Sequence, residues 1–411
     1  MTKDNRRKEN SGASRLLTVV VTFVAMGLFA LGGIFMADAV RSSRSPVTER
    51  ATTSDTGGPP PSSTTPGAEK SAVEEDADSP ALEMLPAPFV LGSHEPAIPL
   101  YRSPESAMPR PEGIMTRSAM REIGLEITVD EKRKVELPLE SVLALPGDTV
   151  EITATVRGGG RLWITAEGDD PVRNRGRVTT QWIAPPTPGF EVIRIRHPVT
   201  ATEARIHAFT MVPYDRVEGG RLNGYRIGSY PSNPLGDNPI YEPPPGFVEV
   251  TRESADVRVS PHFTLGQFPA KQSQAFPKYI VLRPLLLRKM EWVLEALADR
   301  GYPVRSFHVM SGYRTPFYNN HVLGNVRYSR HQWGGAADVF VDERPRNGMM
   351  DDLTNDGKIT VADARVIHSV VDSLELDMGA NFPVGGLGLY RANAVRGPFV
   401  HMDVRGTRAR W

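Results

Sequence analysis

The strand that carries Asp338 restricts the fold more than any other part of this 411-residue chain. Residues 336–341 have the pattern of a short buried strand, in which Asp338 stands among small and apolar side chains. A buried carboxylate is stable only when a salt bridge, a set of backbone donors or a metal ion compensates its charge. His331 precedes this strand, and Gly334 and Gly335 let the backbone turn tightly enough for the two side chains to converge. The pair is therefore a candidate for metal ligation.

A second strand, near the end of the sequence, supplies a third candidate ligand. Its side chains alternate, so that Phe399, His401 and Asp403 share one face. Two imidazoles and one carboxylate, with a fourth position left to water, form the ligand set of a catalytic rather than a structural zinc. The alternative is that His331 and Asp338 form a salt bridge or a helix cap and that His401 is a hydrogen-bonded core residue. The chain has no cysteine, so any zinc must be held by histidine and carboxylate.

The segment 329–338, followed by the distant His401, resembles the zinc D-alanyl-D-alanine peptidases and their Hedgehog-like relatives. Segments 311–316 (Ser-Gly-Tyr-Arg-Thr-Pro) and 399–403 (Phe-Val-His-Met-Asp) make the chain most similar to the murein endopeptidase K type of bacterial cell-wall enzyme. The resemblance covers residues 251–411 only, and it implies a zinc peptidase domain there. It also implies that the following residues contact the substrate: Ser311, Tyr313 and Ser329.

Arg314 and Asp403 are the candidate catalytic residues besides the ligands. A guanidinium suits either a substrate carboxylate or the oxyanion that forms when water attacks an amide, and the resemblance gives Arg314 that role. The alternative is an arginine in an ordinary salt bridge. Many members of the wider superfamily carry Glu or Asp three residues before the last histidine, where this chain has Pro398. Asp403 is expected either to act as the general base or to orient an imidazole, and His308 and His321 are further candidates for the base.

Together with the ligand set, this resemblance implies a zinc-dependent D,D- or L,D-peptidase, either carboxypeptidase or endopeptidase, that acts on peptidoglycan stem peptides or cross-links. The alternative is a non-catalytic peptidoglycan-binding protein on the same fold, which Pro398 favours. The chain has 48 basic and 48 acidic residues and so no net charge, which excludes nucleic acid as an expected partner. It contains neither Ser-x-x-Lys nor His-Glu-x-x-His, so serine peptidase and zincin arrangements are excluded too.

Residues 352–363 match the pattern of a twelve-residue calcium loop. Oxygen side chains stand at positions one, three, five, nine and twelve, and Gly357 occupies the sixth position, where a sharp turn is needed. Position twelve is Asp rather than Glu, as in dockerin-type loops. The alternative is an Asn-Asp-Gly turn that caps the following helix. The candidate ligands of this structural calcium are Asp352, Thr354, Asp356, Lys358 and Asp363.

The sequence of residues 1–37 predicts that the protein is exported from the cytoplasm. Residues 1–15 are rich in Lys and Arg and precede an uncharged run, 16–37, long enough to cross a hydrocarbon core of about 30 Å. The basic tail is expected to stay in the cytoplasm, with a single-pass helix in the inner membrane and the remaining domains in the periplasm or otherwise outside the cytoplasm. The competing interpretation is a cleavable signal peptide, because Ala37-Asp38-Ala39 fits a cleavage site.

Residues 38–85 are rich in Ser, Thr, Pro and Gly and predict a disordered linker. Alternating apolar and polar residues in 86–250 predict an all-β, sandwich-like domain that acts as a spacer or binding module. Residues 251–411 are expected to form the α+β peptidase domain, with a helix at 283–300. The expected strands of the β domain are 125–129, 134–139, 149–156, 161–166, 179–183, 191–196 and 205–212, and a strand is also expected at 304–310.

Overall fold

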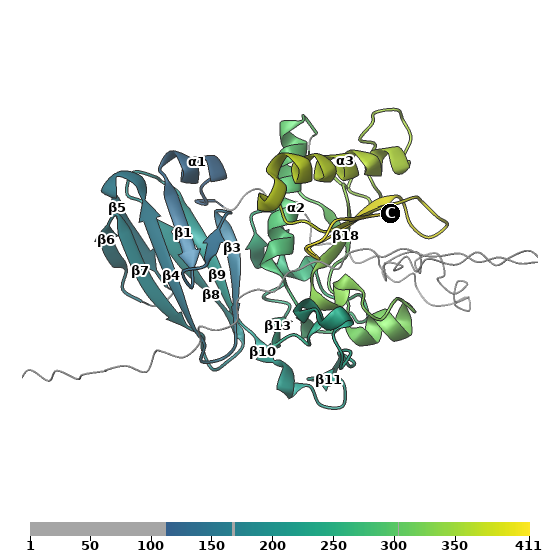
Figure 1. Cartoon of the computed structure of the whole chain (residues 1–411), viewed down its shortest axis with the longest axis horizontal. Helices are drawn as coiled ribbons and strands as arrows, with labels where there is room; N and C mark the ends of the chain where they lie inside the picture. The colour runs from purple at the N-terminus through teal and green to yellow at the C-terminus, as the bar shows by residue number, and fades with distance from the viewer. Residues whose placement is uncertain (1–111, 167–168, 303) are drawn as a thin grey trace, which may run out of the picture. The chain divides into compact units, whose positions relative to one another are not determined.

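A computed structural model describes residues 112–166, 169–302 and 304–411 (Figure 1). The predicted cytoplasmic tail, membrane helix and linker, and the first residues of the predicted β domain, lie outside these ranges. Among the helices of the described residues, none has the length and apolar character needed to span a membrane. The described chain is mixed α+β and consists mostly of strands arranged in several sheets.

The first part of the described chain forms two sheets that share one apolar core. One sheet has the order β2-β1-β4-β7 and the other β3-β9-β8-β5-β6, as far as the described residues show. Ile127 and Ile152 of the first sheet and Ile193 and Ile206 of the second are fully buried in the same cluster. The elements are α1 (Arg117–Glu122), β1 (Leu125–Val129), β2 (Arg133–Val135), β3 (Leu139–Ala144), β4 (Thr149–Val156), β5 (Arg161–Thr165), β6 (Val172–Arg175), β7 (Arg177–Ile183), β8 (Gly189–Arg196) and β9 (Glu203–Thr210).

The strand predicted at 134–139 is wrong, because the structure divides this segment between two sheets. β2 ends at Val135, and β3 begins at Leu139 and pairs with β9 in the other sheet. The backbone N–H groups of Glu136 and Leu137 donate to the carboxylate of Glu140 rather than to a neighbouring strand. The intervening Pro138 has no N–H to contribute to a ladder. A side-chain acceptor and a proline therefore end one strand and start the next.

Several short strands follow in the chain, before the helix α2 (Pro284–Asp299). The order β10-β13-β16 forms one small sheet, and β11 with β12, and β14 with β15, form hairpins in the described chain. Their bounds are β10 (Val212–Pro213), β11 (Arg221–Leu222), β12 (Tyr225–Arg226), β13 (Gly246–Val250), β14 (Arg258–Ser260), β15 (Phe263–Thr264) and β16 (Lys278–Ile280).

A sheet of order β17-β18-β20-β19-β21, counted in the described residues, carries the candidate ligands, and its helices are α2 (Pro284–Asp299) and α3 (Val361–Met378) (Figure 1). Ala337 and Val339, which alternate with Asp338, are buried in one core with the apolar stripes of both helices. The helix predicted at 283–300 is confirmed, with its proline in the first turn, whereas the strand predicted at 304–310 is confirmed only in part. The strands are β17 (His308–Ser311), β18 (Ala336–Phe340), β19 (Gly386–Tyr390), β20 (Phe399–Asp403) and β21 (Ala409–Arg410).

Candidate metal centre

A tight turn places His331 beside the start of β18. His331 lies in a short 3-10 helix, Arg330–Trp333, that ends at Gly334 in the left-handed conformation with φ of 63°. A Cβ atom at Gly334 would lie 2.2 Å from the carbonyl oxygen of Val281, so both the backbone angle and the available space require glycine. The glycine of the motif thus fixes the position of the histidine relative to the strand.

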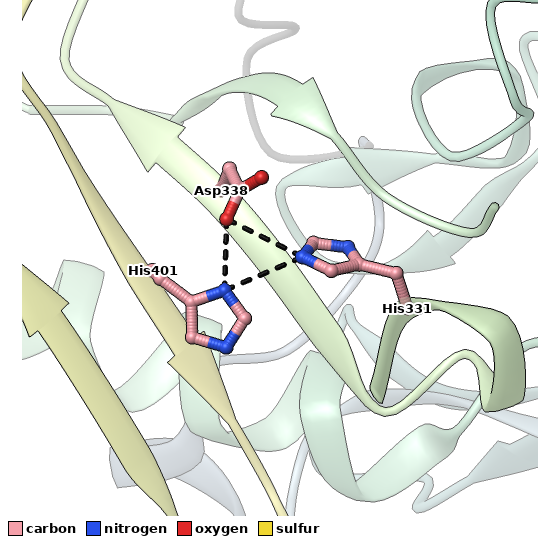
Figure 2. Close-up of side chains that lie close together, drawn as sticks. All are labelled: His331, Asp338 and His401. Carbon is pink, nitrogen blue, oxygen red and sulfur yellow. Dashed lines mark hydrogen bonds and ion pairs between the residues drawn. The ribbon is translucent and has the colours of Figure 1, made fainter. Parts of the chain in front are cut away.

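Strand pairing brings the third ligand into place. β18 and β20 are antiparallel, and Asp338 lies directly opposite His401, so that their side chains emerge on the same face of the sheet. Figure 2 shows the three side chains pointing toward a common centre. Oδ1 of Asp338 lies 2.8 Å from Nδ1 of His401 and 3.3 Å from Nε2 of His331, and these two nitrogens are 3.3 Å apart. The residues are at most 3 % exposed.

The hydrogen bonds of the two imidazoles leave lone pairs directed at this centre. Nδ1 of His331 donates to the carbonyl oxygen of Gly312 over 2.7 Å, so Nε2 carries a lone pair. Nε2 of His401 faces the carboxylate of Asp403 at 3.3 Å, and with the proton on that nitrogen Nδ1 of His401 carries a lone pair that faces Oδ1 of Asp338. Two such lone pairs and a carboxylate oxygen form a group that can hold a cation. Tetrahedral bonds of about 2.0–2.1 Å would separate ligand atoms by about 3.3–3.4 Å, so two of the three distances fit a metal ion directly.

Buried charges around Asp338 favour its ionised form. Burial alone raises the pKa of Asp338, but His331 and Arg314 outweigh burial and lower this pKa well below its usual value. Burial, assisted by the charge of Arg314, lowers the pKa of His331, so its imidazole stays neutral and able to bind a metal. The buried group formed by His331, Asp338 and His401 can therefore hold a metal ion.

The structure places Arg314 on the ligand carboxylate. Its Nη2 donates to Oδ2 of Asp338, its Nε donates to Oγ of Ser311 over 2.8 Å, and its side chain is almost fully buried. Nη1 makes no hydrogen bond within the described part of the chain. Arg314 thus holds Asp338 in place with one edge of the guanidinium and keeps one nitrogen for another group.

Asp403 is committed to internal contacts. It accepts hydrogen bonds from the N–H of Gly386 and from Arg405, and it faces His401. Burial alone raises the pKa of Asp403, but the bonds from His401 and Arg405 bring it well below the usual range. A fully buried carboxylate that holds its charge so firmly is a weak proton acceptor. These contacts support the orientation of His401 as its role, rather than general base.

The residues predicted to contact substrate differ in accessibility. Ser311 lies beside the centre, where its hydroxyl accepts the bond from Arg314. The hydroxyl of Tyr313 is paired with that of Tyr230 over 2.9 Å, and both Tyr313 and Ser329 are 1 % exposed. Tyr313 is therefore buried and paired with Tyr230, as is typical of a residue that stabilises the site without contacting a substrate.

The other histidines considered for proton transfer lie outside the ligand group. His308, on β17, stacks on Phe340 with ring centroids 4.5 Å apart and faces Asp342 at 3.5 Å. Because His308 is paired with Phe340, it lies on the same sheet face as Asp338. His321 is exposed in a short π-helical turn, Tyr318–Val322, and stacks beside Phe317 at 5.6 Å.

Two residues near the centre were missed by the sequence reasoning. Lys289 of α2 is fully buried and donates to the carbonyl oxygen of Asp403 over 2.8 Å, and burial lowers its pKa to about 8. The only sequence signal was a lysine on an otherwise apolar helix face. The ring of Trp411 lies 5.3 Å from that of His401 and covers Gly388, where a Cβ would lie 2.5 Å from the indole nitrogen.

The segment 352–363 begins without a preceding helix and leads into α3. The carboxylate of Asp352 accepts from the N–H of Gly357 over 2.7 Å, and Asp363 accepts from the N–H groups of Leu353 and Thr360. Thr360 and Asp363 form a capping box at the start of α3. A cap and a calcium loop would use the same carboxylates, so calcium stays a prediction.

Calcium is expected to raise the melting temperature of the wild-type protein, and Asp356→Ala to remove most of that increase. Without calcium this variant should be nearly neutral, because the exposed carboxylate accepts only from the N–H of Lys358 among the described residues. Asp363→Asn, by contrast, should cost about 1 kcal/mol even without calcium, because it also weakens the capping box of α3. Thermal unfolding with calcium or with a calcium chelator measures both effects. If the melting temperature of the wild-type protein does not change with calcium, the segment is only a turn that caps α3.

Comparison with known proteins found no match to the chain, either among family models or among curated proteins.

Proposed function

We propose that this chain is a zinc peptidase that hydrolyses peptide bonds in the stem peptides or cross-links of peptidoglycan. The observation that carries the proposal is the convergence of His331, Asp338 and His401 at distances suited to a small tetrahedral ion. Two nitrogen ligands and one oxygen ligand suit zinc, with one position left for water. The resemblance of segments 311–316, 329–338 and 399–403 to cell-wall peptidases supports peptidoglycan as the substrate. The finer fold assignment, to the Hedgehog-like peptidases, is part of the same proposal.

Zinc in this centre would supply an activated water and polarise the scissile carbonyl. The residues of the chain hold the ligands in the required orientation. Gly312 fixes the tautomer of His331, Asp403 faces the distal nitrogen of His401, and Arg314 binds the outer oxygen of Asp338. The remaining Nη1 of Arg314 is suited to bind the negative charge that develops on the substrate oxygen.

Pro398 favours a second candidate function, a peptidoglycan-binding protein without hydrolytic activity. The residue is buried and has no group that could accept a proton. Asp403 does not replace such a group, because Arg405 and Gly386 already occupy its oxygens. An open ligand position and a buried arginine beside the centre favour hydrolysis, since binding alone requires neither.

The full-length chain is expected to contain about one zinc per molecule and to release fragments from purified murein sacculi. A chelator should remove both the metal and the activity, and added zinc should restore them, because the proposed reaction needs the metal that the three ligand residues would hold. Metal analysis and chromatography of the soluble fragments provide the measurements. Zinc without cleavage would favour the binding protein, and absence of zinc would exclude both forms of the proposal. We further propose that the chain is anchored by residues 16–37 and acts outside the inner membrane.

A further inference from the structure

A hollow with two arginines in its lining lies beside the segment that follows Arg314. The cavity has a volume of about 370 Å³ and is bordered by the β11–β12 hairpin and the segment after Arg314. Its lining includes Gly219, Gly220, Arg221, Arg226, Phe317 and His321. None of these residues belongs to the ligand group or contacts it through a hydrogen bond in the described chain.

The hairpin brings two positive charges together. β11 and β12 pair antiparallel, with Arg221 directly opposite Arg226, so their side chains share one face. Like charges directly opposite each other destabilise a strand pair. In residues 112–166, 169–302 and 304–411, neither arginine forms an ion pair with a carboxylate. An anion bound between them would remove this repulsion.

Both guanidinium groups are held by other contacts that leave donors available. One nitrogen of Arg221 donates to the carbonyl oxygen of Gly224 over 3.0 Å. The guanidinium of Arg226 lies 4.8 Å from the centre of the Phe317 ring, so its face is occupied and its N–H edges remain. Planar guanidinium edges match the two oxygens of a carboxylate. The hollow is thus built for an anion with a planar pair of oxygens.

The hollow lies within the length of a short peptide from Arg314, whose side chain binds the candidate ligand Asp338. Phe317 follows Arg314 by three positions, so their Cα atoms are at most about 11 Å apart. Gln272 joins the two regions, because it accepts from Thr315 over 2.7 Å and donates to the carbonyl oxygen of Arg226 over 2.7 Å. An extended peptide covers about 3.3–3.6 Å per residue, so about three of its residues span the distance between the Cα atoms of Arg314 and Phe317.

We propose that this hollow binds a free carboxylate of the peptidoglycan stem peptide, on a residue removed from the bond that is cut. The identity of the ligand rests on the proposed peptidase function, whereas the anion site rests on Arg221 and Arg226 alone. The site would select stem peptides with a free carboxylate over peptides in which that group is an amide, because an amide brings no negative charge to the two arginines.

The test measures binding rather than cleavage. Chelator-treated, full-length protein is titrated with a soluble muropeptide that has free side carboxylates and with the same muropeptide after their amidation. We expect the amidated peptide to bind about 10-fold to 100-fold more weakly, as for the loss of a charge-assisted hydrogen bond. The double variant Arg221→Gln, Arg226→Gln should bind both peptides equally. Arg177→Gln, an exposed arginine on β7, is the control and should keep the preference.

The outcomes separate this inference from the proposed function. Equal affinity of the wild-type protein for both peptides, or binding of neither, would overturn the carboxylate site even if zinc-loaded protein cleaves sacculi. A preference that survives in the double variant would also overturn it. A preference lost in the double variant, in a chain that cleaves nothing, would support the site and overturn hydrolysis.

Discussion

His331→Ala is expected to abolish metal binding and to lower the cleavage of murein by at least about 1000-fold, which corresponds to roughly 4 kcal/mol in the activation barrier. The imidazole supplies one of three ligand atoms at the buried centre, and alanine leaves only two of them. Metal analysis and the rate of fragment release measure the two effects. The sheets with the other apolar core should keep their far-UV circular dichroism, since their core is separate.

A matched histidine on the same domain controls for loss of an imidazole in general. His368, on α3, is partly exposed and faces Asp372 at 3.6 Å, away from the ligand group. His368→Ala should therefore retain both zinc and activity. Unchanged zinc content in His331→Ala would show that the ligand assignment is wrong.

Arg314→Met is expected to have the second largest effect, through two separable causes. Loss of the guanidinium leaves Oδ2 of Asp338 buried without its donor, which should weaken zinc binding by about 10-fold to 100-fold. At saturating zinc, cleavage should still be slower by about 100-fold or more, because the developing oxyanion loses its donor. Zinc affinity and kcat at saturating zinc are measured separately.

Arg314→Lys keeps the positive charge but replaces a planar fork by a single ammonium group. It should restore part of the zinc affinity, because an ammonium can still neutralise Asp338. It should restore little of the cleavage rate at saturating zinc. If excess zinc restores the full rate in Arg314→Met, the arginine only positions the ligand. If neither zinc affinity nor rate changes, both roles are excluded.

The members of the ligand group could be predicted because each one stands in a pattern that is visible in the nearby sequence. Asp338 and His401 each lie on a strand whose pattern of side chains is visible in the sequence, and Gly334 and Gly335 after His331 predict the turn. The contact between Arg314 and Asp338 could not be predicted, because it depends on an irregular register between Val309 and Ser311 on β17. No periodic pattern encodes such an irregularity.

The misjudged parts depend on contacts between distant segments. The segment 134–139 has the composition of a strand, and only the carboxylate of Glu140 and the pairing of β3 with β9 divide it. Lys289 was not predicted as part of the site, yet it is fully buried and donates to the carbonyl oxygen of Asp403, 114 positions away. The role of such a residue is set by tertiary packing, which outweighs local preference.

The separation of the ligands along the chain has a thermodynamic consequence. His331 and His401 are 70 positions apart, and they meet only when β18 and β20 are paired. A metal that binds the paired sheet and not the unfolded chain adds its binding energy to folding, by about 4 kcal/mol when its free concentration is 1,000 times the Kd. The lifetime of the folded domain would then depend on the metal supply of the compartment in which the protein resides.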